Sequence, residues 1–225
     1  MKANTLHEAQ RPLFKQLVTT AVEVRKYTED KKLPAENRLA RGAGVILSSS
    51  GLILTAYHFI RRCRVVRVRR LRLDTKYWRL HVYGSYKADI IYRDTRADIA
   101  LLKLRKPPSD LVATTIGDID IPPIGEPLFR VGRDDVPLAA GWYYQLGEHM
   151  HRRIKLMSVS MLVGPGSSGG PIHDDKGRLI GICLYRQATE LYPPAAYVLP
   201  FSAVASRILR QKEVRDQLVE WKTPH

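Results

Sequence analysis

The sequence predicts an all-β protein built from antiparallel strands, and two observations carry this prediction. Short runs of apolar or alternating residues recur along the chain, and turn-forming residues separate them at the spacing typical of a barrel. A length of 225 residues is compatible with a single two-lobed domain of this class. The chain shows no apolar run long enough for a membrane span or a secretory signal, so a cytoplasmic protein without a transmembrane segment is expected.

A helix is expected first, because Leu13, Leu17, Ala21 and Val24 follow Pro12 at three- and four-residue spacing. Residues 31–37 are expected to link this helix to the strands, so that residues 1–37 precede the barrels. Strands are then predicted from their apolar or alternating patterns at residues 65–69, 79–83, 90–92, 99–104, 127–131, 154–159 and 179–184. Residues 174–177, Asp-Asp-Lys-Gly, have the composition of a hairpin turn. Ser202 is expected to cap a final helix over about residues 202–220.

The segment Gly164–Pro171 carries the clearest chemical signal in the chain. It places Ser168 in a glycine-rich turn of the form Gly-x-Ser-Gly-Gly-Pro. A serine hydroxyl needs an adjacent base to act as a nucleophile, and the oxyanion formed by its attack needs preorganised N–H donors, which glycines let the backbone bring close. The same residues also fit an ordinary glycine-serine loop, so other residues must decide between the two interpretations.

Two further residues supply the partners that such a serine needs. His58 ends an apolar run, and Asp98 opens another. Taken singly, His58 is also compatible with a half-buried structural histidine, and Asp98 with a polar residue at the start of a strand. Together with Ser168 they occur in the order His, Asp, Ser, which among serine hydrolases belongs to a double-barrel fold. We therefore predict that His58, Asp98 and Ser168 form a catalytic triad.

With these residues in place, the chain resembles the trypsin-like peptidases, and within them the HtrA/Deg branch without a PDZ domain. The matching segments are residues 42–47, 50–55 with His58, 116–120, 124–127, 131–132, the serine loop, 177–182 and 196–200. The resemblance implies two six-stranded antiparallel β-barrels, at about residues 38–110 and 120–200 of a peptidase domain covering residues 38–225. It also implies a serine endopeptidase that hydrolyses polypeptides through an acyl-enzyme and needs neither cofactor nor metal.

The resemblance also implies how the serine loop works. The N–H groups of Gly166 and Ser168, with Ser167 as an additional donor, are expected to form the oxyanion hole. The family usually has asparagine where this chain has Gly164 and Ser167. Because Ser167 is uncharged, it cannot form the salt bridge that activates trypsin zymogens. Ordering of the loop by neighbouring loops, by substrate or by an activating protein partner is expected instead, and the family tends to self-associate.

Substrate preference is predicted from the residues before the serine. Leu162 and Val163 stand where this fold lines its primary pocket, and neither offers the carboxylate that a Lys or Arg preference requires. An aliphatic residue before the scissile bond is therefore expected. By family similarity, the substrate is expected to add as a β-strand along Ala195, Ala196 and Tyr197.

The chain is strongly basic, with 37 Lys and Arg against 22 Asp and Glu and a formal net charge of +15. Seven arginines crowd one segment, namely Arg61, Arg62, Arg64, Arg67, Arg69, Arg70 and Arg72. Such a segment can bind nucleic acid or acidic partners, or it can simply be solvated; we expect the second. A protease-like scaffold that binds polyanions is the alternative function, and an esterase with the same triad is a further one. Cys63 and Cys183 are expected to be free thiols, because their segments should lie far apart.

Overall fold

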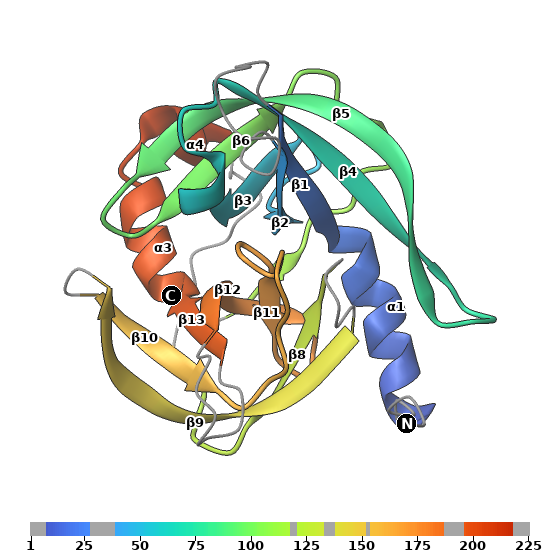
Figure 1. Ribbon diagram of the computed structural model, residues 1–225, viewed down its shortest axis with the longest axis vertical. Coiled ribbons are helices and arrows are strands. Elements are labelled where there is room, and N and C mark those ends of the chain that lie inside the picture. The colour runs from blue at the N-terminus through green and yellow to red at the C-terminus, as the bar shows by residue number, and fades with distance from the viewer. Residues whose placement is uncertain are drawn as a thin grey trace.

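The strands form two closed antiparallel barrels in the computed structural model, which describes residues 8–27, 39–117, 121–132, 138–151, 154–186 and 196–217. Figure 1 shows the first barrel in blue to green at the top and the second in yellow to orange below it. This confirms the predicted all-β class and the pair of six-stranded barrels.

The first barrel contains β1 (Ala21–Tyr27), β2 (Leu39–Ile46), β3 (Leu52–Ala56), β4 (Val65–Asp74), β5 (Arg79–Asp94) and β6 (Ile99–Leu104). They close in the order β1-β2-β3-β6-β5-β4. Alternation explains the closure, because Val22, Val24, Val66 and Val68 turn into the barrel and are buried while charged residues between them face outward. The two strands predicted at residues 79–83 and 90–92 are parts of one long strand, β5.

The second barrel contains β8 (Pro127–Val131), β9 (Leu138–His151), β10 (Ile154–Val159), β11 (Pro171–His173), β12 (Arg178–Arg186) and β13 (Ala196–Pro200). The order is β11-β8-β9-β10-β13-β12, and pairing of β11 with β12 closes the barrel. The short strand β7 (Thr115–Ile116) joins the edge of β12 in parallel as the chain passes between the barrels.

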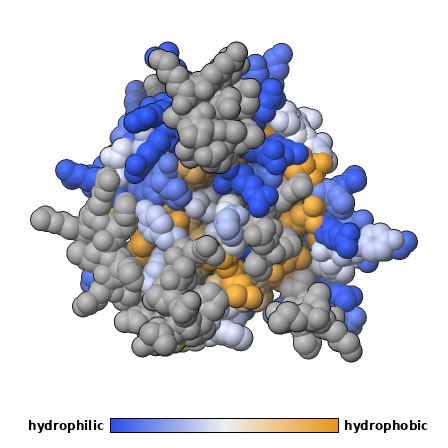
Figure 2. Space-filling view, viewed as in Figure 1, coloured by the Kyte–Doolittle hydropathy of each residue, from blue (hydrophilic) through white to orange (hydrophobic). Residues whose placement is uncertain are grey.

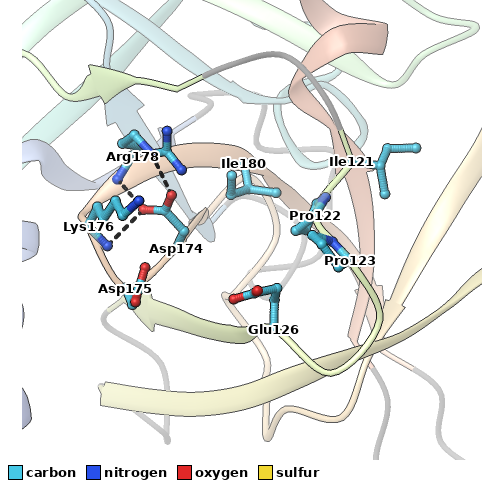
Figure 3. A pocket seen from close by; sticks show the side chains of 9 residues that line it. All are labelled: Ile121, Pro122, Pro123, Glu126, Asp174, Asp175, Lys176, Arg178 and Ile180. Carbon is cyan, nitrogen blue, oxygen red and sulfur yellow. Dashed lines mark hydrogen bonds and ion pairs between the residues drawn. The ribbon is translucent and has the colours of Figure 1, made fainter.

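The hairpin turn predicted at residues 174–177 connects β11 to β12. The Asp174 carboxylate accepts hydrogen bonds from the backbone N–H groups of Lys176 and Arg178 and from the Arg178 side chain, at 3.0, 2.8 and 2.6 Å. Gly177 takes the positive φ of 76° that the turn requires. A hollow of about 340 Å³ lies beside this turn, with Glu126 and the Pro122-Pro123 segment across from it (Figure 3). None of the predicted site residues lines this hollow.

The helices lie at the ends of the chain and differ from the predicted boundaries. The single turn η1 (Glu8–Gln10) leads into α1 (Arg11–Thr20), and β1 begins at the next residue. The expectation that residues 1–37 precede the first barrel is therefore wrong, since β1 pairs with both β2 and β4 and completes that barrel. The linker predicted at residues 31–37 lies outside the described residues.

The final helix is also shorter than predicted. α3 (Phe201–Ile208) begins after Pro200, and no side chain caps it, so the predicted cap by Ser202 is wrong. A turn separates α3 from α4 (Lys212–Gln217), and residues 218–220 lie outside the described residues. No helix in the described ranges is long and apolar enough to cross a membrane.

The two barrels share one apolar core, which fixes their relative position. Leu54 and Leu101 of the first barrel belong to the same buried cluster as Leu184 and Leu199 of the second. α1 adds a second bridge, because Phe14 packs edge-to-face on Phe129 of β8 while the same cluster includes Leu71 of β4. Full burial of one such side chain is worth about 1.5–3 kcal/mol. In Figure 2 hydrophilic side chains dominate the upper part of the view, and most apolar surface lies lower.

Candidate active site

The loop that carries Ser168 connects β10 to β11 and is held against both barrels. Its backbone accepts a hydrogen bond at Ser168 O from Ala43 N–H of β2, at 2.8 Å, and donates from Gly169 N–H to Cys183 O of β12, at 2.7 Å. Gly169 has a φ of 82°, and a side chain there would collide with Ala43 O and Thr55 Oγ1. Only glycine lets the loop approach β2 and β3 this closely, which explains the sequence after the serine.

The structure brings His58, Asp98 and Ser168 together in one hydrogen-bonded line. His58 Nδ1 lies 2.6 Å from Asp98 Oδ2, and His58 Nε2 lies 2.9 Å from Ser168 Oγ. His58 starts the single turn η2 (His58–Ile60) after β3, so the first barrel contributes the imidazole and the second the hydroxyl. The side chain of Asp98 is 4% exposed and that of His58 is 29% exposed, so the line runs from the interior to the surface.

Asp98 owes its position to the turn between β5 and β6. Asp94 Oδ1 accepts hydrogen bonds from the N–H groups of Arg96 and Ala97, which tightens this turn. Asp98 then adopts a positive φ of 58°, a conformation that aspartate tolerates better than most residues. Its carbonyl accepts a hydrogen bond from Tyr57 N–H at 2.9 Å, which ties the aspartate backbone to the residue before His58.

Comparison with known proteins identifies the family. A family profile described as "Trypsin-like peptidase domain" matches residues 42–182, well over half of the chain. The chain belongs to this family.

Similar proteins include DegP-like proteases. The chain is 29% identical over 150 residues to a "Probable periplasmic serine endoprotease DegP-like" of Marinomonas sp. (strain MWYL1), covering 64% of this chain and 29% of that protein. It is 29% identical over 160 residues to the "Magnetosome formation protease MamE" of Paramagnetospirillum magneticum, covering 68% of this chain and 20% of that protein. The chain thus spans less than a third of these relatives. The DegP-like matches confirm the predicted resemblance to the HtrA/Deg branch.

A solved structure supports the fold. The crystal structure of the serine endoprotease from Yersinia pestis superposes with a TM-score of 0.69 and 21% sequence identity, covering 95% of this chain and 69% of that one. The relatives also overturn one expectation from the sequence. Three of the DegP-like relatives are named periplasmic proteases, which contradicts the prediction of a cytoplasmic protein.

In this trypsin-like peptidase domain a fourth residue, which the sequence did not indicate, contacts the predicted triad. The hydroxyl of Tyr185, on β12, donates to Asp98 Oδ2 at 3.0 Å. Its ring stacks on the imidazole of His58, with centroids 5.8 Å apart and planes 23° from parallel. Tyr185 thus contacts both Asp98 and His58. No local pattern predicts this contact, because 87 residues separate Tyr185 from Asp98.

The predicted oxyanion donors differ from one another in their hydrogen bonds. Ser167 N–H donates to Gly164 O at 3.1 Å, so it is committed to the turn itself. Within the described part of the chain, the N–H groups of Gly166 and Ser168 donate to no protein acceptor. Gly166 has a φ of 100°, a conformation that favours glycine. In this conformation the N–H groups of Gly166 and Ser168 are therefore available to a ligand. The N–H group of Ser167 is not, because it already donates to Gly164 O.

The residues of the predicted substrate pocket differ in exposure and in strand pairing. Leu162 is half exposed and Val163 is buried, both in the segment that leads to the serine loop. Ala196 and Tyr197 are buried in β13, and Ala195 lies outside the described residues. β13 pairs with β10 on one side and β12 on the other. The prediction that a substrate strand adds along residues 195–197 is therefore wrong, because both edges of the described part of that strand are already paired.

A different strand edge lies beside Ser168. Ser168 Oγ lies 3.4 Å from Leu184 O, and Tyr185 follows directly in β12. β11 and β7 pair with β12 only nearer its start, before residue 184. At residues 184–186, β13 is therefore the only described strand that pairs with β12. The edge of β12 next to the triad is thus the better candidate for substrate pairing.

The seven predicted arginines do not form one face. Arg70 is buried and its guanidinium binds the Asp110 carboxylate at 2.7 and 3.1 Å. Arg69 binds Glu23 at 3.0 Å on the outer face of the first barrel. Arg61, Arg62 and Arg64 lie in the turn before β4, while Arg67 and Arg72 are exposed on that strand. Because these arginines point in different directions, the structure gives no support to a scaffold that uses all seven.

Neither Cys63 nor Cys183 is in a disulfide, as predicted, and both are buried. Cys63 packs in the core of the first barrel and Cys183 in that of the second. Burial raises the pKa of the Cys63 thiol. The Cys183 thiol lies 3.8 Å from the hydroxyl of Ser167, within reach of a weak hydrogen bond.

Proposed function

We propose that this protein is a serine endopeptidase in which His58, Asp98 and Ser168 act as a catalytic triad. The observation that carries the proposal is the unbroken path from Asp98 Oδ2 through the imidazole to Ser168 Oγ, with steps of 2.6 and 2.9 Å. An ionised carboxylate can only accept, so His58 carries its proton on Nδ1 and its Nε2 accepts from the serine hydroxyl.

The proposed reaction follows from these positions. Ser168 Oγ attacks the scissile carbonyl carbon while His58 Nε2 takes its proton, and the carbonyl oxygen becomes an oxyanion. The N–H groups of Gly166 and Ser168 stabilise that charge. His58 then gives the proton to the departing amine, which leaves an acyl-enzyme on Ser168. A water molecule repeats the cycle, with His58 as base, and releases the acid.

Substrate binding is proposed at the edge of β12 and the segment before the serine loop. The substrate residues that precede the scissile bond pair with Leu184 and Tyr185, and the side chain at the bond lies toward Leu162 and Val163. Both of these are aliphatic, so we propose an aliphatic residue at that position, with roughly 1–3 kcal/mol of discrimination per misplaced methylene-sized group. Cleavage of a peptide library followed by sequencing of the new ends tests this preference.

Activity is proposed to depend on how well the loop around Gly166 is ordered. Ser167, which lacks a charge, is held by backbone hydrogen bonds within its own turn and by the weak contact from Cys183. A covalent peptide inhibitor is expected to slow amide hydrogen exchange at Gly166 and Ser168, because their N–H groups gain an acceptor. Unchanged exchange in the inhibited enzyme argues against this control. The names of the relatives support a periplasmic setting, which fractionation of expressing cells tests.

The function is tested by peptide hydrolysis with matched variants. The parent is expected to cleave a peptide with an aliphatic residue at the scissile bond and to form a covalent acyl-enzyme visible by mass spectrometry. Ser168→Ala should abolish both, while Ser206→Ala, which removes an exposed hydroxyl on α3, should change neither. Hydrolysis of simple esters without any peptide cleavage indicates an esterase instead.

A further inference from the structure

Four basic residues lie side by side across the first barrel. Arg41 of β2 is directly opposite Arg25 of β1, Arg25 is opposite Arg67 of β4, and Arg67 is opposite Lys87 of β5. Side chains at opposed positions share one face of a sheet and have Cβ atoms about 5 Å apart. Arg41, Arg67 and Lys87 are exposed and Arg25 is half-buried. We call Arg41, Arg25, Arg67 and Lys87 the cationic row.

The cationic row lies on the outer face of the barrel. Val24 and Val68, which neighbour Arg25 and Arg67 in sequence, are fully buried in the core. Alternation along each strand therefore turns the basic side chains toward the outside. Like charges in directly opposed positions repel one another and weaken strand pairing. A bound anion would relieve this repulsion, so the row is suited to a negatively charged partner.

Among the described residues, the Glu23 carboxylate borders the row and is already shared. Glu23, on the same face of β1, accepts from Arg25 Nε at 2.5 Å and from Arg69 Nη1 at 3.0 Å. A single negative charge is thus divided between two guanidinium groups. The four residues of the row together with Arg69 carry five positive charges around this carboxylate. Among these six described side chains, five are positively charged and one is negatively charged.

The row begins at the proposed oxyanion hole. A Cβ atom on Gly166 would lie 3.3 Å from Arg41 Nε and 3.4 Å from Arg41 Cγ, so the Arg41 side chain lies against this glycine. Two residues further along β2, Ala43 N–H binds Ser168 O. The residues before the scissile bond are proposed to pair with the β12 edge, and we place the residues after it beside Gly166 and Arg41.

We propose that the cationic row binds acidic residues that follow the scissile bond, so that the enzyme prefers polypeptides with an acidic segment on the leaving-group side. This inference rests on the proposed peptidase function. The row crosses three gaps of about 4.8 Å between strands, and an extended peptide covers the resulting distance of roughly 14 Å with about four to five residues. A polypeptide is favoured over a nucleic acid because the row starts beside the nucleophile and continues the substrate path.

The test uses quenched fluorescent peptides that share all residues before the scissile bond. They carry Glu, Gln or Lys at the second to fourth positions after it. The parent is expected to cleave the Glu peptide with a kcat/KM about tenfold above that of the Gln peptide at low salt, because three exposed ion pairs contribute roughly twofold to threefold each. The ratio should fall toward one at about 0.5 M salt, where screening is strong.

Two sets of variants locate the effect. Arg67→Gln with Lys87→Gln, and the same pair with Arg41→Gln, should lower the Glu-to-Gln ratio stepwise toward one. The ratio within each variant removes any change in overall activity. The control is Lys15→Gln with Lys76→Gln and Arg79→Gln, which removes three exposed charges from α1 and from the end of the β4–β5 hairpin. It should keep the ratio of the parent.

The outcomes separate this inference from the proposed function. Cleavage of the Gln peptide with a Glu-to-Gln ratio near one in the parent overturns the inference alone, as does an equal loss of the ratio in the control. Cleavage of none of the peptides contradicts the proposed function. Binding of the acidic product peptide to the Ser168→Ala variant tests the row directly, without cleavage. If an oligonucleotide of equal charge binds more tightly than the acidic product peptide, and the row variants lose that binding, the partner is a nucleic acid and the inference is wrong.

Discussion

Tyr185 donates a hydrogen bond from its hydroxyl to Asp98 Oδ2, the same carboxylate oxygen that lies 2.6 Å from His58 Nδ1. The ring that carries this hydroxyl also stacks on the imidazole. One side chain therefore restrains the carboxylate by a hydrogen bond and the histidine by ring contact. A displacement of the imidazole by a fraction of an ångström would lengthen the hydrogen bond between His58 Nε2 and Ser168 Oγ. Tyr185 is therefore a positioning residue of the proposed triad.

Removal of the Tyr185 hydroxyl should slow the chemical step. Tyr185→Phe deletes a hydrogen bond to a carboxylate, worth about 1.5 kcal/mol, and we expect kcat to fall roughly tenfold with little change in KM. The downfield proton resonance of His58 Nδ1–H should shift, which a purely structural role would not produce. Tyr77→Phe removes a phenol hydroxyl that is far more exposed and should leave kcat unchanged. A rise in KM at constant kcat would contradict this role.

Gly169 should tolerate no side chain. Gly169→Ala places a methyl group against Ala43 O and Thr55 Oγ1 in a backbone conformation with φ of 82°. We expect a loss of about 3 kcal/mol or more in unfolding free energy and loss of peptide hydrolysis, because backbone atoms cannot move aside cheaply. Gly125 is the matched control, since its φ is 93° but a Cβ there meets nothing within 4 Å. Gly125→Ala should cost only the conformational strain, about 1–2 kcal/mol, by urea denaturation.

His173 should make the fold sensitive to acid. Complete burial lowers the pKa of His173 from 6.5 to about 3, while its Nε2 lies 3.2 Å from Thr114 Oγ1. Between these values the unfolded chain binds a proton that the folded chain does not. The stability that the uncharged, buried His173 contributes is therefore fully present above pH 6.5. As the pH falls toward 3, the free energy of unfolding decreases by roughly 1 kcal/mol per pH unit.

Urea denaturation at several pH values checks this expectation. His173→Gln should flatten the loss of stability between pH 6.5 and pH 4 relative to the parent, whereas His81→Gln, at an exposed histidine, should not. The proton NMR signals of the His173 ring offer a check that needs no variant. A ring that titrates near its ordinary value in the folded protein contradicts the account.

Glu23 should stabilise the outer face of the first barrel. Its side chain is 1% exposed and holds Arg25 and Arg69. Glu23→Gln leaves two guanidinium groups beside each other, and we expect a loss of about 1–3 kcal/mol in unfolding free energy, larger at low salt. Asp89→Asn, which breaks a solvent-exposed pair with Arg105, is the control and should have little effect. Equal effects of the two substitutions would show that burial is not the cause.

The sequence predicts the residues of the site better than their surroundings. His58 ends an apolar run, Asp98 opens another, and Ser168 lies in a glycine-rich turn. Their order along the chain selects a fold in which such residues meet. The positions of Gly166 and Gly169 also follow from local conformation. These are local signals, so they can be recognised in a linear sequence.

Other features depend on pairing between distant segments. Ala21 and Val24 continue the spacing of α1, yet they enter β1 because β2 and β4 provide partners on both sides. The same residues also alternate as in a strand, with Val22 and Val24 inward and Glu23 outward. This alternation prevails over the helical spacing because the neighbouring strands pair with it. Similarly, β13 is closed to substrate because of its two neighbours. Tyr185 reaches Asp98 only after both barrels close.

The most direct test of the central claim is covalent labelling of the parent and of two serine variants with a fluorophosphonate probe. The parent should be modified once, at Ser168. Ser167→Ala should still be labelled, because the hydroxyl that it removes faces Cys183 rather than His58, and Ser168→Ala should not be labelled while remaining folded by circular dichroism. Labelling of Ser168→Ala at the level of the parent, or no labelling of the parent with or without a peptide substrate, would contradict the assignment of Ser168 as the nucleophile.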